Sequence, residues 1–211
     1  MGFGGGMTGA IARRVGTEQS ATRAQIVASA EAVIREEGYA AASTRRVAAH
    51  AGLKPSLVHY YFPTTEDLFL EVIRKGAAES DESLQKALEA PDPVTALWHF
   101  FIDSSRNALA LETMALAKHR KAIRAEIAEH SERMRAHQVE VIDRLLGLRL
   151  AQTGACTAAG LSVVLAGVGR ALGMEGGLGI TTGHAEARRW VEAWLARMLG
   201  QQRDLENIEP D

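Results

Sequence analysis

Apolar residues recur every three or four positions along most of the chain, whereas the strict alternation of apolar and polar residues that marks a β-strand is nearly absent. The first periodic segment starts at Thr22, a residue type that caps helix N-termini, and ends at Gly38, a residue type that ends helices. Within it, Ile26, Ala30 and Val33 fall on one face. The pattern predicts an all-α fold with about nine helices.

Shorter segments follow, and glycine and proline mark their limits. Proline is tolerated near the start of a helix because it lies in the first helical turn. Three helices are predicted before the break APDP at residues 90–93: TRRVAAHAG capped by Ser43 or Thr44, KPSLVHYYF after the break at Gly52, and a helix capped by Thr64 or Thr65 that runs towards Leu88.

The second half is also predicted to be helical, over residues 94–109, 111–119, 121–150, 157–174 and 184–199. Residues 1–20 are Gly-rich and are predicted to be a disordered arm. Arg13 and Arg14 would let this arm reach DNA, although a plain unstructured leader fits its composition equally well. The chain thus divides into the arm 1–20, a helix-turn-helix domain 21–75, a helical domain 76–200 and a tail 201–211.

Charge divides the chain unevenly. Up to Phe62 there are 7 basic and 4 acidic residues, a net charge of +3, and the remainder has 17 basic and 22 acidic residues, a net charge of −5. No acidic residue occurs between Gly38 and Thr65. A basic module on an acidic body is the polarity expected of a protein that binds nucleic acid at one end.

Candidate catalytic chemistry is sparse. The single cysteine, Cys156, excludes an internal disulfide and suits a reducing compartment. No secretory signal or membrane-spanning run is visible, so we expect a cytoplasmic protein without a membrane partner. The sequence contains no Gly-x-Ser-x-Gly, His-Glu-x-x-His or Glu-x-x-His motif. We therefore expect no enzyme activity, no cofactor and no metal ion.

Residues 44–62 meet the packing requirements of a helix-turn-helix. Ala48 is small where two helices cross, Gly52 tolerates a left-handed turn four residues later, and Val58 supplies an apolar anchor six residues after Gly52. The inward-facing set is then Val47, Leu53, Phe62, Phe69 and, half-buried, Tyr61. The outward-facing set suits phosphate and base contacts in a DNA duplex, and consists of Arg45, Arg46, Lys54, Ser56, His59 and Tyr60.

The segment from Thr22 to about Lys75 resembles the DNA-binding domain of the TetR family of bacterial transcriptional regulators. The resemblance rests on a first helix ending in Gly38-Tyr39, on the helix-turn-helix after it, and on YYF followed by TEDLF. It implies a homodimer that places paired recognition helices in adjacent major grooves of a near-palindromic double-stranded DNA operator. It also implies that the domain 76–200 binds a small-molecule effector and dimerises, with repression relieved by the effector as the default.

Carried over residue by residue, the resemblance assigns DNA contacts to Thr44, Arg45, Lys54, Ser56, His59, Tyr60 and Tyr61. Thr65 stands where family members often carry lysine, so its contact is expected through its hydroxyl or the helix N-terminus. A helical protein-interaction module without DNA binding is the alternative. It predicts that replacing Arg45 or Tyr60 by alanine leaves function intact.

His130 and His137 occupy positions of an apolar stripe in the predicted helix 121–150. Three interpretations are open for these residues: ordinary histidines in or near the core, polar groups of a ligand pocket, and a metal site. The pocket would be lined by Trp98, Phe101, Met114, His130, Met134 and His137.

The last two predicted helices carry large apolar residues, and small residues such as Gly167 and Gly169 permit a close crossing with another helix. The resemblance implies that these two helices form a four-helix dimer interface with their symmetry mates, and plain intramolecular core is the alternative. The residues concerned are Leu161, Val164, Leu165, Val168, Trp190, Trp194 and Met198.

Overall fold

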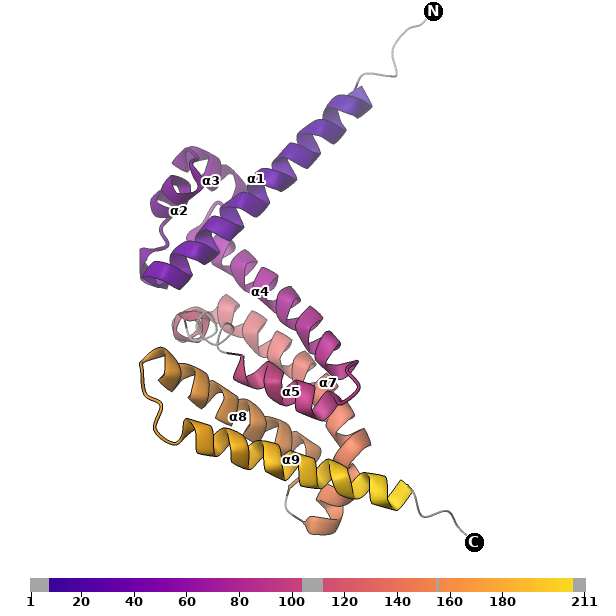
Figure 1. Cartoon of the computed structure of the whole chain (residues 1–211). Helices are drawn as coiled ribbons and strands as arrows, with labels where there is room; N and C mark the ends of the chain where they lie inside the picture. Colours follow the sequence, from indigo (N-terminus) through magenta and orange to yellow (C-terminus); the bar gives the residue numbers. More distant parts are fainter. Residues whose placement is uncertain (1–7, 104–111, 155, 207–211) are drawn as a thin grey trace, which may run out of the picture.

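The computed structural model describes residues 8–103, 112–154 and 156–206, and throughout this part of the chain the regular secondary structure is helical (Figure 1). The prediction of an all-α fold is confirmed. The long helix α1 (Thr8–Glu37) stands beside two short helices, α2 (Thr44–Ala51) and α3 (Pro55–Tyr61). From these helices α4 (Thr65–Leu88) leads into the second half of the molecule (Figure 1).

The start of α1 differs from the prediction. The helix begins at Thr8, so the predicted start at Thr22 is wrong, and part of the segment predicted as a disordered arm is helical. No proline interrupts residues 8–37, and the alanine, arginine, glutamate and glutamine residues there favour helix, so Thr22 has no reason to be a boundary. Residues 1–7 of the predicted arm lie outside the described residues. Gly38 ends the helix as predicted, with φ at 81°.

Local signals set the ends of the next helices. The Ser43 hydroxyl accepts a hydrogen bond from the Arg46 N–H at 3.2 Å and caps α2. Gly52 adopts the left-handed conformation, φ 68° and ψ 27°, that turns the chain into α3. α4 opens with a capping box: the Thr64 hydroxyl accepts from the Asp67 N–H at 3.1 Å, and the Asp67 carboxylate accepts from the Thr64 N–H at 3.0 Å.

The first core, as we call it, is a hydrophobic cluster that unites α1–α4, with Val58, Phe62 and Leu68 almost completely buried. Leu116 and Ile123, from the second half of the chain, are buried in the same cluster. Each such side chain stabilises the fold by about 1.5–3 kcal/mol when buried. The N-terminal domain is therefore packed onto the second half. The predicted inward-facing set is confirmed, since all its members are buried or half-buried: Val47, Leu53, Tyr61, Phe62 and Phe69.

The second half is built from five helical segments: α5 (Pro93–Ile102), residues 112–117, α7 (Lys121–Thr153), α8 (Ala158–Gly177) and α9 (His184–Glu206). Their predicted places along the chain are confirmed, but the ends differ. α5 stops at Ile102, where Asp103 is extended, so it does not continue unbroken to residue 109 as predicted. α7, α8 and α9 each run beyond the predicted ends. α9 thereby enters the predicted tail 201–211. Residues 104–109 of the predicted helix 94–109 and residues 207–211 of the tail lie outside the described part of the chain.

The second core is the hydrophobic cluster between α5, α7, α8 and α9, with Trp98, Leu146 and Leu165 at its centre. α5 and α8 cross very closely, because a Cβ placed on Gly169 would lie 2.3 Å from the Phe101 carbonyl oxygen. The expectation that a small residue permits a close crossing is confirmed there. α8 is also, by length and apolar composition, the one helix of the described chain that could cross a membrane. Leu161, Leu165 and Leu172 of this helix are buried in the second core, whereas Val163 and Val164 are exposed.

Candidate nucleic-acid interface and ligand pocket

The α2–α3 corner is fixed by backbone hydrogen bonds and by one side chain of α1. Across the turn, the Leu53 N–H donates to the Ala48 carbonyl at 2.9 Å. From α1, Gln25 Nε2 donates to the carbonyl of Ala51 at 2.9 Å. Because Ala48 and Val58 are completely buried at the crossing, the two short helices present a fixed outer surface.

Most of the predicted DNA-contacting residues lie on that outer surface. Tyr60 is 67% exposed, and its ring meets the half-buried Tyr61 ring edge to face, with 5.2 Å between centroids. Within the described chain neither Arg45 nor Lys54 forms an ion pair, so both charges are available to a partner. Ser56 and His59 are exposed as well, while Thr44 and Thr65 are half-buried at the starts of α2 and α4.

Arg46 is placed differently from its neighbour Arg45. Its Nε lies 3.0 Å from both carboxylate oxygens of Glu37, and its Nη2 also donates to that carboxylate. The Arg46 hydrogen bonds hold the pKa of the Glu37 carboxyl below its ordinary value. Arg46 therefore joins α2 to the end of α1, and a DNA contact through it would first have to break this pair.

A second charged pair braces α1 against α4. Arg23 Nη1 donates to the Glu71 carboxylate at 2.5 Å, and the Arg23 guanidinium lies 5.1 Å from the centre of the Phe62 ring. The hydrogen bond from Arg23 lowers the pKa of Glu71. The residues that follow the recognition helix are thus held to α1 by charge as well as by apolar packing.

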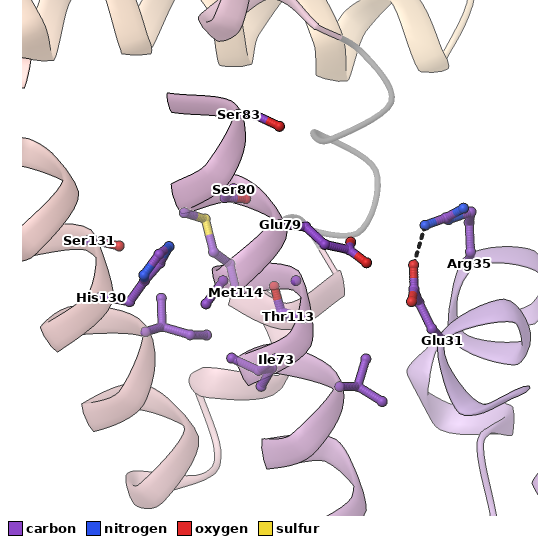
Figure 2. Close-up of a pocket in the computed structure, with 14 residues that line it drawn as sticks. Glu31, Arg35, Ile73, Glu79, Ser80, Ser83, Thr113, Met114, His130 and Ser131 are labelled. Carbon is purple, nitrogen blue, oxygen red and sulfur yellow. Dashed lines mark hydrogen bonds and ion pairs between the residues drawn. The ribbon is translucent and has the colours of Figure 1, made fainter. Parts of the chain in front are cut away.

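A cavity of about 490 Å³ opens between α1, α4, α7 and the helical residues 112–117. We call it the cavity from here on. Figure 2 shows His130 and Ser131 of α7 on one side and Glu31 and Arg35 of α1 on the other, with Ile73, Glu79, Ser80 and Ser83 of α4 between them. Its lining mixes apolar and hydrogen-bonding groups, as small-molecule sites do.

His130 is the polar group that the cavity leaves unsatisfied. Its side chain is 13% exposed, and its Nδ1 is buried without a hydrogen-bond partner among the described residues. The nearest acid, Asp81, holds its Oδ1 3.7 Å from that nitrogen, which is too far for a hydrogen bond. A buried polar atom without a partner destabilises the protein by about 1–3 kcal/mol, so a ligand that hydrogen-bonds this nitrogen gains a contact.

The wall formed by α1 and α4 is charged but internally paired. Glu31 binds Arg35 at 2.5 Å and Lys75 at 2.6 Å, and Lys75 also binds Glu79 at 2.8 Å. Hydrogen bonds from Lys75 to Glu31 and Glu79 raise the pKa of the lysine. The wall thus carries two carboxylates, Glu31 and Glu79, and two cations, Arg35 and Lys75, so its formal charges balance.

The structure brings only part of the predicted pocket together. Met114 and His130 line the cavity. Trp98 is instead buried in the second core, where its Nε1 donates to Glu192 at 3.4 Å. Phe101 and Met134 also pack against the second core, and His137 is exposed and does not line the cavity. Seven residues are about two helical turns, so His137 shares a face of α7 with His130 but lies about 10 Å further along the helix, beyond the cavity.

Sequence reasoning missed the α1 and α4 walls of the cavity. A usable signal exists on α4, where Gly76, Ala77, Ser80 and Ser83 follow Ile73 at helical spacing with small or polar side chains. Small side chains on an inward face leave volume that larger apolar residues would fill. Among the described residues no group of three His, Cys, Asp or Glu side chains is placed to hold a metal ion.

The predicted dimer residues divide into two groups. Leu161, Leu165 and Met198 are buried in the second core, with Val168 and Trp194 packed against it, so these are internal residues of the chain. Val164 and Trp190 are 53% and 63% exposed. Val163, not included in the prediction, is also 53% exposed. α8 and α9 therefore carry large apolar side chains that nothing in the described chain covers.

Comparisons with known proteins show which family model and which solved structures resemble this chain. The family model of the bacterial regulatory proteins of the TetR family matches residues 26–72. No curated protein matches the sequence. A TetR transcription regulator from Haloarcula marismortui superimposes with a TM-score of 0.67 at 19% identity, over 85% of this chain and 98% of that one. A transcriptional regulator from Rhodococcus sp. Rha1 gives a TM-score of 0.64 at 18% identity, over 85% of this chain and 94% of that one.

A third structure contains a ligand. It is described as a transcriptional regulator from Saccharomonospora viridis in complex with choline, and it superimposes with a TM-score of 0.62 at 18% identity, over 74% of this chain and 85% of that one. The matched segment 26–72 contains the α2–α3 corner and its exposed surface, and the structural matches extend through the helical second half. Residues 26–72 thus carry the N-terminal domain of the TetR family of bacterial regulatory proteins, and the described chain has the all-helical fold of TetR regulators.

Proposed function

We propose that the protein is a ligand-responsive repressor, which binds a near-palindromic operator as a homodimer in the cytoplasm and leaves it when a small molecule enters the cavity. One observation carries the proposal. The cavity is walled by α1 and α4, the same helices that hold the α2–α3 corner. A ligand at this wall would therefore act on the part of the molecule that supports the DNA-binding surface.

The DNA-binding step rests on the exposed surface of α2 and α3. Arg45 and Lys54 supply unpaired positive charge, and Ser56, His59 and Tyr60 supply hydrogen-bonding groups for phosphates or base edges. The residues at the edges of this surface, Thr44, Tyr61 and Thr65, would make supporting contacts. We place Arg46 in a supporting role as well, because Glu37 holds its guanidinium.

Release by a ligand follows from the position of α4. Val72 and Ile73 line the cavity on one side and belong to the first core, together with Phe62 at the end of the recognition helix. A ligand shifts the protein between two arrangements only as far as it binds one of them more tightly. Displacement of α4 by a ligand would change the separation of the two recognition helices in a dimer, and both half-site contacts would be lost together.

The cavity favours a small ligand that has apolar surface and at least one hydrogen-bonding group. The charges on its wall are paired with one another, its lining is apolar at Ile73, Met114 and Ile127, and His130 offers an unsatisfied nitrogen. The structural relative from Saccharomonospora viridis binds choline, a small organic cation, at 18% identity to this chain. Choline is therefore a reasonable first probe.

Dimerisation is assigned to α8 and α9. Val163, Val164 and Trp190 expose apolar surface there, and a second copy in the family's four-helix arrangement would cover it. The variant Trp190→Glu tests this directly. Sedimentation velocity should show a dimer for the wild-type protein and a monomer for the variant, and a variant that stays dimeric would move the interface elsewhere.

The central experiment is fluorescence anisotropy with a duplex from upstream of the protein's own gene, beside a scrambled duplex, with and without choline. The proposal expects preference for the upstream duplex, steep weakening with salt and release by a molecule that fills the cavity. Equal binding to both duplexes would mean that the upstream duplex does not contain the operator. Absence of binding to either duplex at low salt would refute the repressor.

A further inference from the structure

Four consecutive basic-type residues, Lys118, His119, Arg120 and Lys121, make up the turn after the helical residues 112–117 and the first residue of α7. We call this turn the basic corner. It was not among the DNA-contacting residues predicted from the sequence. Within the described chain none of its residues forms an ion pair, whereas Arg23, Arg46, Arg74 and Lys75 each bind a carboxylate. Its charge is therefore unneutralised.

The basic corner is fixed at the DNA-binding end of the molecule. The residues on either side of it, Leu116 and Ile123, are buried in the first core together with Val58 of the recognition helix. The Arg120 guanidinium lies 5.6 Å from the centre of the Phe69 ring, in the second turn of α4. A shallow hollow joins the corner to α4 through Glu66, in the first turn of that helix.

The hollow has the chemistry of an anion site. It is lined by Glu66, His119, Arg120, Lys121 and Ala122, so two permanent cations face one carboxylate. α7 begins in the same place: its N-cap residue, Arg120, makes no side-chain hydrogen bond to the first N–H groups of this 33-residue helix. Free N–H groups and the positive end of the helix dipole favour a phosphate there, and the lysines add charge that reaches further.

We propose that the basic corner is a second DNA-contacting surface, in which Lys118 and Lys121 bind backbone phosphates beside the half-site read by α2 and α3. The proposal rests on DNA binding as described under the proposed function. Because α4 starts where the recognition helix ends, an anion that approaches the first turn of α4 also approaches the corner. Contacts of this kind strengthen binding on any sequence and add no sequence preference.

The test is a salt series of DNA affinity for the double variant Lys118→Gln/Lys121→Gln, measured by anisotropy on the upstream and the scrambled duplex. Each phosphate contact contributes about 0.9 to the slope of log K against log salt, so loss of four contacts from a dimer lowers the slope by up to about 3.6. The affinity should fall on both duplexes by the same factor. The variant Glu66→Gln should act in the opposite sense and strengthen binding.

A matched control removes two positive charges far from this end of the molecule, in Lys86→Gln/Arg144→Gln, from α4 near its C-terminal end and from the second half of α7. The control should keep the wild-type slope. Equal losses in both double variants would mean that net charge has a general effect on binding. An unchanged slope in Lys118→Gln/Lys121→Gln would mean that the basic corner does not contact DNA, and an acidic protein partner would then be the candidate. Either result overturns the proposal. Failure of DNA binding itself is recognised separately, because then the wild-type protein binds neither duplex.

Discussion

The two halves of the molecule differ in the kind of surface that they leave exposed. In the N-terminal half the apolar side chains are buried in the first core, charged pairs such as Arg23–Glu71 brace the helices from outside, and the exposed face is polar. In the C-terminal half a tight crossing at Gly169 closes the second core, yet Val164 and Trp190 stay exposed. A polar face suits a hydrated, charged partner such as DNA, and an apolar face suits a partner protein surface.

The crossing of α5 and α8 is the point at which the C-terminal half is most easily broken. Gly169→Val should lower the free energy of unfolding by about 3 kcal/mol or more, because overpacking forces backbone to move and the Phe101 carbonyl leaves no room for a Cβ. Urea unfolding followed by circular dichroism measures the change. Gly167→Ala, two residues earlier and with nothing within 4 Å of the new Cβ, should be neutral or stabilising by up to about 1 kcal/mol. Equal stability of both variants would mean that the helices cross less closely.

The same contrast explains which features of the fold could be predicted. Gly38, Gly52 and the Thr64 cap act on their immediate neighbours, so spacing along the chain was enough to place them. The start of α1 at Thr8 was missed because a capping-type residue such as Thr22 can also lie inside a helix, and only a real break in the backbone would have ended it.

The cavity was harder to predict, since it forms between helices that are far apart in the sequence. His130 was found because it interrupts an apolar stripe, and Met114 was named as part of the apolar wall. Glu31 was missed because it lies on α1, about a hundred residues before His130 in the sequence. Trp98 was assigned to the pocket from its chemistry, and the packing of four helices buried it in the second core. For the predicted dimer residues, periodicity likewise marked an apolar face without saying what covers it: Leu165 is buried in the second core, and Trp190 is exposed and stays a predicted interface residue.

The adjacent residues Arg45 and Arg46 test which charges of the N-terminal half contact DNA directly. Arg45→Ala should weaken DNA binding by about tenfold to a hundredfold, as expected for loss of a direct contact to phosphate or base. Arg46→Ala should have a clearly smaller effect, because Glu37 already holds its guanidinium. Anisotropy titrations of both variants on one duplex measure the difference. Glu37→Gln is the matched control, and it should strengthen binding by releasing Arg46; losses of equal size in the two arginine variants would contradict this division of roles.

The cavity lies where the two halves meet, and replacing His130 tests whether the cavity binds a ligand. His130→Leu should raise the free energy of unfolding by about 1 kcal/mol, because it replaces a buried unsatisfied nitrogen by an apolar group. Thermal unfolding with and without choline should show that the variant is more stable alone and gains less from the ligand. His137→Leu, on an exposed position, is the control and should change neither quantity. A variant that is less stable than the wild type would mean that His130 has a structural partner.

The smallest effect is expected from the Arg23–Glu71 brace, and it depends on pH. The Arg23 hydrogen bond holds the pKa of Glu71 below its ordinary value of 4.5, so the pair stabilises the folded state above that value and loses its effect as the pH falls through the lower folded-state pKa. Since the Arg23 side chain is 44% exposed, solvent limits the contribution to at most about 1 kcal/mol.

A double-mutant cycle of Arg23→Gln and Glu71→Gln isolates that contribution from the contact between Arg23 and Phe62. Urea unfolding at several pH values should give a coupling free energy that is constant near neutral pH and shrinks below about pH 4.5. Coupling that persists unchanged in acid would mean that the brace acts through packing and not through charge. The N-terminal half would then be held in the same way as the C-terminal half, and the contrast between the two would reduce to their exposed faces.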